Sequence, residues 1–199
     1  MNEVQSRAMR GMMWGGLGSL MQQLLNMVVG VCLARLLSPD DYGLVGMLAV
    51  FAALAGTLQE SGFTAALANR KEVSASDYNA VFWVSLGISV CCYAVLFFAA
   101  PLIADFYGEP ELVWLSRYLF IGFVFASLGV APGAWLFRNL MVRQRTLVQV
   151  PALVVSGAVG IALAWRGLGS WALATQTIVY VAMCSTWYWW LCPWHPVMK

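Results

Sequence analysis

Charged residues are scarce in this chain. They make up 10% of its 199 residues, whereas hydrophobic residues make up 61%. A soluble domain usually contains about 25% charged and about 45–50% apolar residues. The composition therefore excludes an ordinary soluble domain and predicts that lipid surrounds most of the chain.

Groups that carry out chemistry are also few. The sequence has one histidine and no glycine-rich phosphate-binding motif, and its turns are too short for a catalytic cluster. Its five cysteines lie within or beside apolar segments, which favours packing over a disulfide framework. We therefore predict that the chain is not an enzyme, and that it has no catalytic residues, metal site, cofactor or nucleic-acid partner.

Long apolar segments are what the sequence does contain. Each is roughly 19–27 residues long, and about 20 helical residues cross a bilayer core of about 30 Å. The pattern predicts an all-α polytopic membrane protein, in which residues 1–199 form one six-helix lobe. The predicted spans are residues 12–36, 42–66, 78–104, 112–137, 147–165 and 169–191.

The cations of the turns alternate between many and few. Eight of the eleven fall on one side of the predicted membrane: Arg7, Arg10, Arg70, Lys71, Arg138, Arg143, Arg145 and Lys199. The other side has only Arg35, Arg117 and Arg166. The positive-inside rule then predicts that both termini are cytoplasmic. All ten tryptophans lie near a predicted span end, where indole prefers the headgroup layer.

Two local patterns predict how particular helices begin and bend. The second span is predicted to begin with a Ser38 N-cap and with Pro39 at the first helical position. The two aspartates that follow place acids at the positive end of the helix. Pro132 is expected to kink the fourth span, while Gly129 and Gly133 allow a neighbouring helix to approach closely.

Polar residues form a stripe in each of the first two spans. One face of the first span carries Ser19, Gln22 and Asn26. One face of the second span carries Thr57, Glu60 and Thr64. Polar groups facing lipid are costly, so each stripe either lines a hydrophilic cavity or forms interhelical hydrogen bonds. A short turn is expected to make these spans antiparallel neighbours, with both stripes facing one space.

The other candidates for a substrate site each have two interpretations. Glu60, the only acid well inside a span, is either functional, or it reaches the inner interface or pairs with a loop arginine. Arg35 and Arg117 either extend to the headgroups or face inward to attract an anionic substrate. Gln176 in the last span is either a cavity residue or a structural one.

Several segments resemble bacterial polysaccharide exporters. They resemble the oligosaccharide flippase family of the multidrug/oligosaccharidyl-lipid/polysaccharide superfamily, in its lipopolysaccharide or colanic-acid exporter branch. The likeness runs from about residue 10 to the end. The motifs that carry it are LARLLSPDDYGLV at 33–45, GFTAAL at 62–67, NRK at 69–71, FYGEPEL at 106–112, FRNLMVR at 137–143 and PWHP at 193–196.

The resemblance implies a two-lobe transporter with six helices in each lobe, of which this chain is the N-terminal lobe. The second lobe is absent, so the chain is expected to be a truncated product, a fragment, or a half that pairs with another chain. Family members move polyprenyl-diphosphate-linked oligosaccharides across the bacterial inner membrane for cell-surface polysaccharide or lipopolysaccharide synthesis. Glu60 would then be the candidate for coupling to an ion gradient.

The partners that the resemblance implies are the lipid-linked oligosaccharide, membrane lipids, a second lobe and polysaccharide polymerisation proteins. Two other functions remain open. A drug/cation antiporter of the same superfamily would share the architecture, but acids would dominate its cavity. A non-transporting membrane scaffold would show large loops.

Overall fold

The structure, a computed structural model, describes residues 2–60, 75–138 and 142–192. Side chains are described for residue 16 and for residues 18–57, 77–136 and 146–192. The part of the predicted second span at 61–66, which includes Thr64, therefore lies outside the described residues.

The described residues form six helices, as the apolar segments predict. Each predicted span overlaps one helix, although α1 and α6 begin before the predicted starts at residues 12 and 147, and α4 continues past the predicted end at residue 104 to Tyr107. The fold is therefore all-α. The helices are α1 (Asn2–Leu36), α2 (Pro39–Glu60), α4 (Ala75–Tyr107), α5 (Leu112–Arg138), α6 (Val142–Trp165) and α7 (Ser170–Leu191).

Four of these helices contain a stretch long and apolar enough to cross a membrane: Gly18–Leu36, Asp77–Tyr107, Leu112–Leu136 and Thr146–Trp165. The helix α2 has two aspartates in its first turn, and α7 is rich in tyrosine and tryptophan and contains Gln176. The chain is a multi-pass membrane protein.

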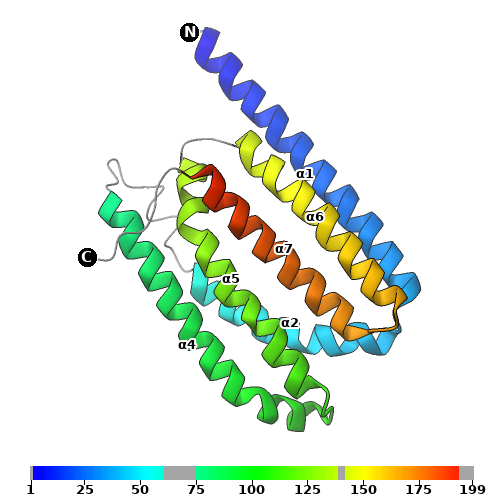
Figure 1. Cartoon of the computed structure of the whole chain (residues 1–199). Helices are drawn as coiled ribbons and strands as arrows, with labels where there is room; N and C mark the ends of the chain where they lie inside the picture. Colours follow the sequence, from blue (N-terminus) through cyan, green and yellow to red (C-terminus); the bar gives the residue numbers. More distant parts are fainter. Residues whose placement is uncertain (1, 61–74, 139–141, 193–199) are drawn as a thin grey trace.

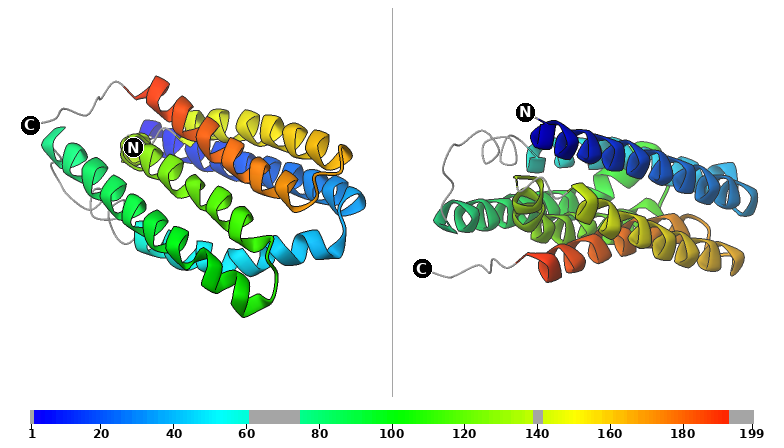
Figure 2. Two further views of the ribbon diagram at one scale, coloured as in Figure 1. Left: turned by 60° about the horizontal axis from the view of Figure 1, so that its bottom comes forward. Right: turned by 90° about the horizontal axis from the view of Figure 1, so that it is seen from above.

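The helices do not pack in chain order. Figure 1 shows five of them side by side in the order α4, α5, α7, α6, α1, and each neighbouring pair in this row is in extensive contact. The sixth helix, α2, crosses this layer obliquely and contacts α7, α4 and α5 (Figure 2). The expectation that α1 and α2 are antiparallel neighbours is therefore wrong for most of their length, because α1 packs along α6.

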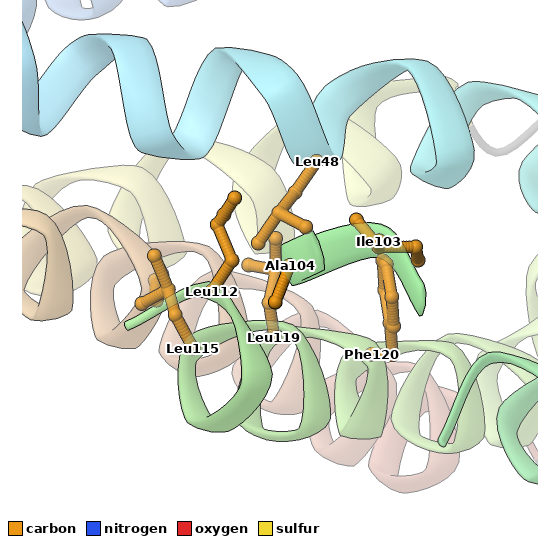
Figure 3. Packing of buried hydrophobic residues seen from close by; sticks show 8 residues of the cluster. Leu48, Ile103, Ala104, Leu112, Leu115, Leu119 and Phe120 are labelled. Carbon is orange, nitrogen blue, oxygen red and sulfur yellow. The ribbon is translucent and has the colours of Figure 1, made fainter. Parts of the chain in front are cut away.

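The contact between α2 and the layer is apolar. Leu48 of α2 packs against Ile103 and Ala104 of α4 and against a row of side chains on α5 (Figure 3). Leu48 and Phe120 are fully buried in this cluster. Because the hydrophobic effect is weak inside a bilayer, close packing of this kind stabilises the arrangement of the helices.

Small residues allow the helices of the layer to approach closely. A Cβ atom added at Gly157 of α6 would lie 2.6 Å from a methyl group of Val29 on α1. A Cβ added at Gly129 of α5 would lie 2.8 Å from the hydroxyl of Ser185 on α7. The prediction that Gly129 and Gly133 admit a neighbour is confirmed, because Gly133 faces Tyr188 of α7.

The helix α5 continues through Pro132 with help from α7. In a regular helix the carbonyl of Leu128 would accept a hydrogen bond from the N–H of residue 132, which proline lacks. The indole Nε1 of Trp189 donates to this carbonyl at 2.9 Å. One turn earlier, the hydroxyl of Ser185 donates to the carbonyl of Phe125 at 2.6 Å. Trp189 thus has an interhelical role in addition to its place near a span end.

The α1–α2, α4–α5 and α6–α7 connections are linked by hydrogen bonds at one end of the layer. The predicted cap of α2 is confirmed, since the Ser38 hydroxyl and the carboxylate of Asp41 bond to each other's backbone N–H groups. Asp41 also accepts the backbone N–H of Ser170 at 3.0 Å, and the Ser170 hydroxyl donates to Glu111 at 3.2 Å. We call this set of four residues the turn-end network.

Candidate functional site

A partly open cavity of about 450 Å³ lies between α1, α2, α6 and α7. Four residues of α2 line it at i, i+3, i+4 and i+7 spacing, which places one face of that helix on the cavity. The lining residues are Asn26, Tyr42, Val45, Gly46, Ala49, Leu153, Ser156, Leu173, Gln176, Thr177 and Tyr180.

The polar groups of this cavity are uncharged. Within the described part of the chain, the amides of Asn26 and Gln176 have no hydrogen-bond partner, so their donors and acceptors are available. The hydroxyls of Ser156 and Thr177 donate to the carbonyls of Leu153 and Leu173. Ser156 is fully buried, whereas Thr177 is exposed and its oxygen is left as an acceptor. The cavity can therefore both donate and accept hydrogen bonds without contributing charge.

Gly160 of α6 fixes the position of Gln176. A Cβ atom at residue 160 would lie 3.0 Å from the Cβ of Gln176 and 3.2 Å from its Oε1. A larger residue at position 160 would therefore require the side chain of Gln176 to shift by a few tenths of an ångström.

Gln22 lies one turn before Asn26 on α1 and forms an interhelical hydrogen bond. Its Nε2 donates to Oε1 of Gln149 on α6 at 2.8 Å. The polar stripe of the first span is thus divided in the structure: Gln22 joins two helices, Asn26 lines the cavity, and Ser19 is exposed.

The two candidate arginines lie away from the cavity. Arg35 is exposed in the last turn of α1. The guanidinium of Arg117 lies 4.3 Å above the ring of Phe97 and 5.3 Å from that of Trp114, and its Nε is buried without a hydrogen-bond partner. Cation–π contact stabilises Arg117 against the aromatic rings of α4 and α5.

Of the candidates of the second span, Thr57 has a described side chain, and it is not among the residues that line the cavity. Thr57 is exposed, and its hydroxyl donates to the carbonyl of Leu54 at 2.8 Å. Glu60 is the last described residue of α2, and its side chain lies outside the described part. Of the seven candidate residues, the structure brings Asn26 and Gln176 together.

Sequence reasoning missed Tyr42, Ser156 and Tyr180 as cavity residues. Tyr42 directly follows the capping residues of α2, where no local pattern indicates a cavity. Ser156 precedes Gly157, and a serine beside a glycine in an apolar helix indicates close packing as readily as a cavity. The signal that remained was the i, i+4 repeat of Ser156 and Gly160 on the face of α6 that meets α7.

No described group of three histidine, cysteine, aspartate or glutamate side chains could hold a metal ion. The carboxylate of Asp41 lies outside the predicted membrane span. Partial burial raises its pKa, but the hydrogen bonds from Ser38 and Ser170 outweigh this effect and place the pKa below its ordinary value.

Comparison with known proteins decides the family. The family described as "Polysaccharide biosynthesis protein" matches this chain over residues 32–199. The chain belongs to this family. Such membership places it among transporter-type membrane proteins rather than enzymes, as the sequence predicts.

Three curated relatives from this polysaccharide biosynthesis group align with much of the chain. The lipopolysaccharide biosynthesis protein WzxC of Escherichia coli (strain K12) is 27% identical over 71% of this chain and 28% of its own length. The succinoglycan biosynthesis transport protein ExoT of Rhizobium meliloti (strain 1021) is 26% identical over 78% of this chain and 31% of its own length. The teichuronic acid biosynthesis protein TuaB of Bacillus subtilis (strain 168) is 25% identical, over 65% and 27% respectively.

The aligned part of the chain thus spans less than a third of the length of each of these family relatives. No solved structure matches the chain significantly.

Proposed function

We propose that this chain is the N-terminal lobe of a two-lobe transporter that moves polyprenyl-diphosphate-linked oligosaccharide across the bacterial inner membrane. The observation that carries the proposal is the polar cavity between α1, α2, α6 and α7 in a chain of the polysaccharide biosynthesis family. A large polar head group needs such a cavity, because lipid offers no hydrogen bonds to replace its hydration.

The names of the relatives support export of a polysaccharide precursor. ExoT is named as a transport protein for succinoglycan biosynthesis, and WzxC and TuaB are named for the synthesis of other surface polymers. A second lobe would complete the cavity wall, and movement of one lobe against the other would open the cavity alternately to each side. We propose this second lobe as the main partner, and polysaccharide polymerisation proteins as further ones.

The proposed location is the inner membrane with both termini cytoplasmic. It is supported by the distribution of the cations and by the acids of the turn-end network, which would then lie on the outer side.

A drug/cation antiporter is the second candidate. It would need carboxylates in its cavity to bind a cation, and none of the described residues that line the cavity is an acid. The uncharged lining therefore favours the oligosaccharide. Glu60 remains a candidate for coupling transport to an ion gradient, on the ground that it is the only acid well inside a predicted span.

The test replaces the matching segment of ExoT with this chain in a Rhizobium meliloti strain that lacks ExoT. Extracellular succinoglycan is the readout, and we expect the chimera to restore a measurable part of it. The 199 residues expressed alone should restore none, because one lobe supplies only part of a cavity wall.

The amount of each protein in the membrane is measured in parallel as the control. A chimera that is as abundant as ExoT and yet exports no succinoglycan would contradict the proposal. Full restoration by the 199 residues alone would contradict the requirement for a second lobe.

A further inference from the structure

The uncharged cavity lining contrasts with the proposed substrate, which is anionic as a whole. A lipid-linked oligosaccharide carries an anionic diphosphate and, next to it, a chain of sugars. The described cations lie elsewhere: Arg35 and Arg166 are exposed at helix ends, and Arg117 lies against Phe97. Among the described residues that line the cavity, none has a charged side chain.

We propose that this cavity binds the uncharged sugar part of the substrate, and that the diphosphate is held outside it. The proposal rests on the proposed function and assigns one part of the substrate to one site. Its physical basis is that a diphosphate in a site of low dielectric constant needs a cation or many donors, whereas a sugar needs paired donors and acceptors.

The hydrogen-bonding groups of the cavity suit a sugar. The amides of Asn26 and Gln176 each provide two donors and an acceptor, which can pair with neighbouring hydroxyls. The exposed oxygen of Thr177 acts as an acceptor, because its proton already bonds to the carbonyl of Leu173. An acceptor oxygen attracts a sugar hydroxyl but repels a phosphate oxygen.

Aromatic and small apolar residues complete the site. Tyr42 of α2 and Tyr180 of α7 both line the cavity and offer ring faces for the apolar C–H face of a sugar ring. Gly46 and Ala49 lie on the cavity face of α2, and their small size keeps the space open. Gly160 acts as a positioning residue, since it leaves room for the side chain of Gln176.

The experiment measures protection of a cysteine placed in the cavity. All five native cysteines are replaced by alanine, and Ala49→Cys is introduced into the full 199-residue chain, purified in detergent. Ala49 lines the cavity and is exposed, so a water-soluble thiol reagent should label it. The probes are neutral glucose- and galactose-based tetrasaccharides, inorganic pyrophosphate and farnesyl diphosphate.

We expect at least one neutral tetrasaccharide to slow the labelling about threefold at a concentration about twice its Kd. Pyrophosphate and farnesyl diphosphate should leave the rate unchanged. Gln176→Ala should abolish the protection by removing an amide, and Gly160→Ala should weaken it by displacing the same amide.

Two variants serve as matched controls. Gln23→Ala removes an exposed amide of α1 that does not line the cavity, and Gly87→Ala fills open space on α4, so both should keep the protection. Circular dichroism verifies that every variant is folded, and Gln176→Ala tests the site even if Gly160→Ala does not fold.

Protection by the diphosphates but not by the sugars would overturn the inference, because the cavity would then hold the anionic part. Protection by none of the probes would overturn it as well. Neither result depends on the succinoglycan assay, which decides separately whether the chain supports export.

Discussion

Asp41 joins two helices through a single side chain. Its carboxylate caps α2 through Ser38 and accepts the backbone N–H of Ser170, at the first residue of α7. Both contacts place negative charge at the positive end of a helix. Because α2 makes few other contacts with α7, this residue matters for the angle at which α2 crosses the layer.

We predict that Asp41→Asn lowers the free energy of unfolding by about 1 kcal/mol at neutral pH. The pKa of Asp41 lies below its ordinary value of 3.8, so its charged form is favoured in the folded protein. The stabilisation is therefore present above that value and is lost as the pH falls through the lower, folded-state pKa. Thermal unfolding of the detergent-solubilised chain from pH 7 to pH 3 measures the effect.

Asp40→Asn is the matched control, since Asp40 is exposed in the same turn and makes none of these hydrogen bonds. It removes the same charge, so its effect should be smaller. Equal effects of the two substitutions, or a difference that does not shrink towards pH 3, would contradict the role given to Asp41.

The sequence predicts the cap that Asp41 forms with Ser38, but it does not predict the contact of Asp41 with Ser170. The bond between Ser38 and Asp41 follows from four neighbouring residues, so a local pattern is enough. The bond to Ser170 joins residues 129 positions apart, and no local pattern specifies it. Asn26 and Gln176 were identified for the same local reason, as polar groups in apolar helices. Their meeting in one cavity depends on which helices are neighbours.

At the scale of the helix, α5 depends on α7 at its proline. Pro132 leaves the carbonyl of Leu128 without its helical partner, and the indole of Trp189 supplies the missing donor. Inside a bilayer, water is not available to take its place. A defect in one helix is thus compensated by a neighbour, which fixes how the two helices lie against each other.

We predict that Trp189→Phe destabilises the chain by about 1 kcal/mol, because it leaves this carbonyl unpaired while preserving an aromatic ring beside Phe82. Adding Pro132→Ala should recover most of the loss, since alanine restores the backbone donor at residue 132. Unfolding by SDS in mixed micelles measures the four corners of this double-mutant cycle.

Trp190→Phe provides the control, because the side chain of Trp190 is 86% exposed and should be replaceable at little cost. If Trp189→Phe destabilises the chain equally with and without Pro132, the hydrogen bond does not compensate for the proline.

The sequence predicts the helices themselves better than it predicts which helices pack against each other. Long apolar runs bounded by turn residues specify each helix, because a bilayer requires every backbone hydrogen bond to be made within it. The order α4, α5, α7, α6, α1 depends on side-chain fit, such as Gly157 against Val29 and Gly129 against Ser185. Consecutive helices with short turns can still diverge, as α1 and α2 do.

At the scale of the whole molecule, the outer surface is apolar where lipid is expected. Phe98, Leu102 and Phe106 on α4 are 76%, 69% and 80% exposed. The polar cavity is lined by α1, α2, α6 and α7, whereas α4 lies at the edge of the layer opposite α1 (Figure 1). The molecule thus separates an exposed apolar edge from a polar space, as the proposed transporter lobe requires.

The orientation of the whole molecule is the last prediction. The turn-end network places the α1–α2, α4–α5 and α6–α7 connections at one end of the layer, and that end carries few cations. Since cation-rich turns remain in the cytoplasm, we expect this end to face the periplasm. Reporter fusions at Asp105 and Gly167 should both be active in the periplasm, whereas a fusion at Arg143 should be active in the cytoplasm.

The fusion at Gly167 is the internal control, because the hydrogen bonds of Ser170 tie its turn to that of Asp105. Agreement of Asp105 with Arg143 would contradict the span assignment, and a reversal of all three would contradict the orientation while leaving the helices intact.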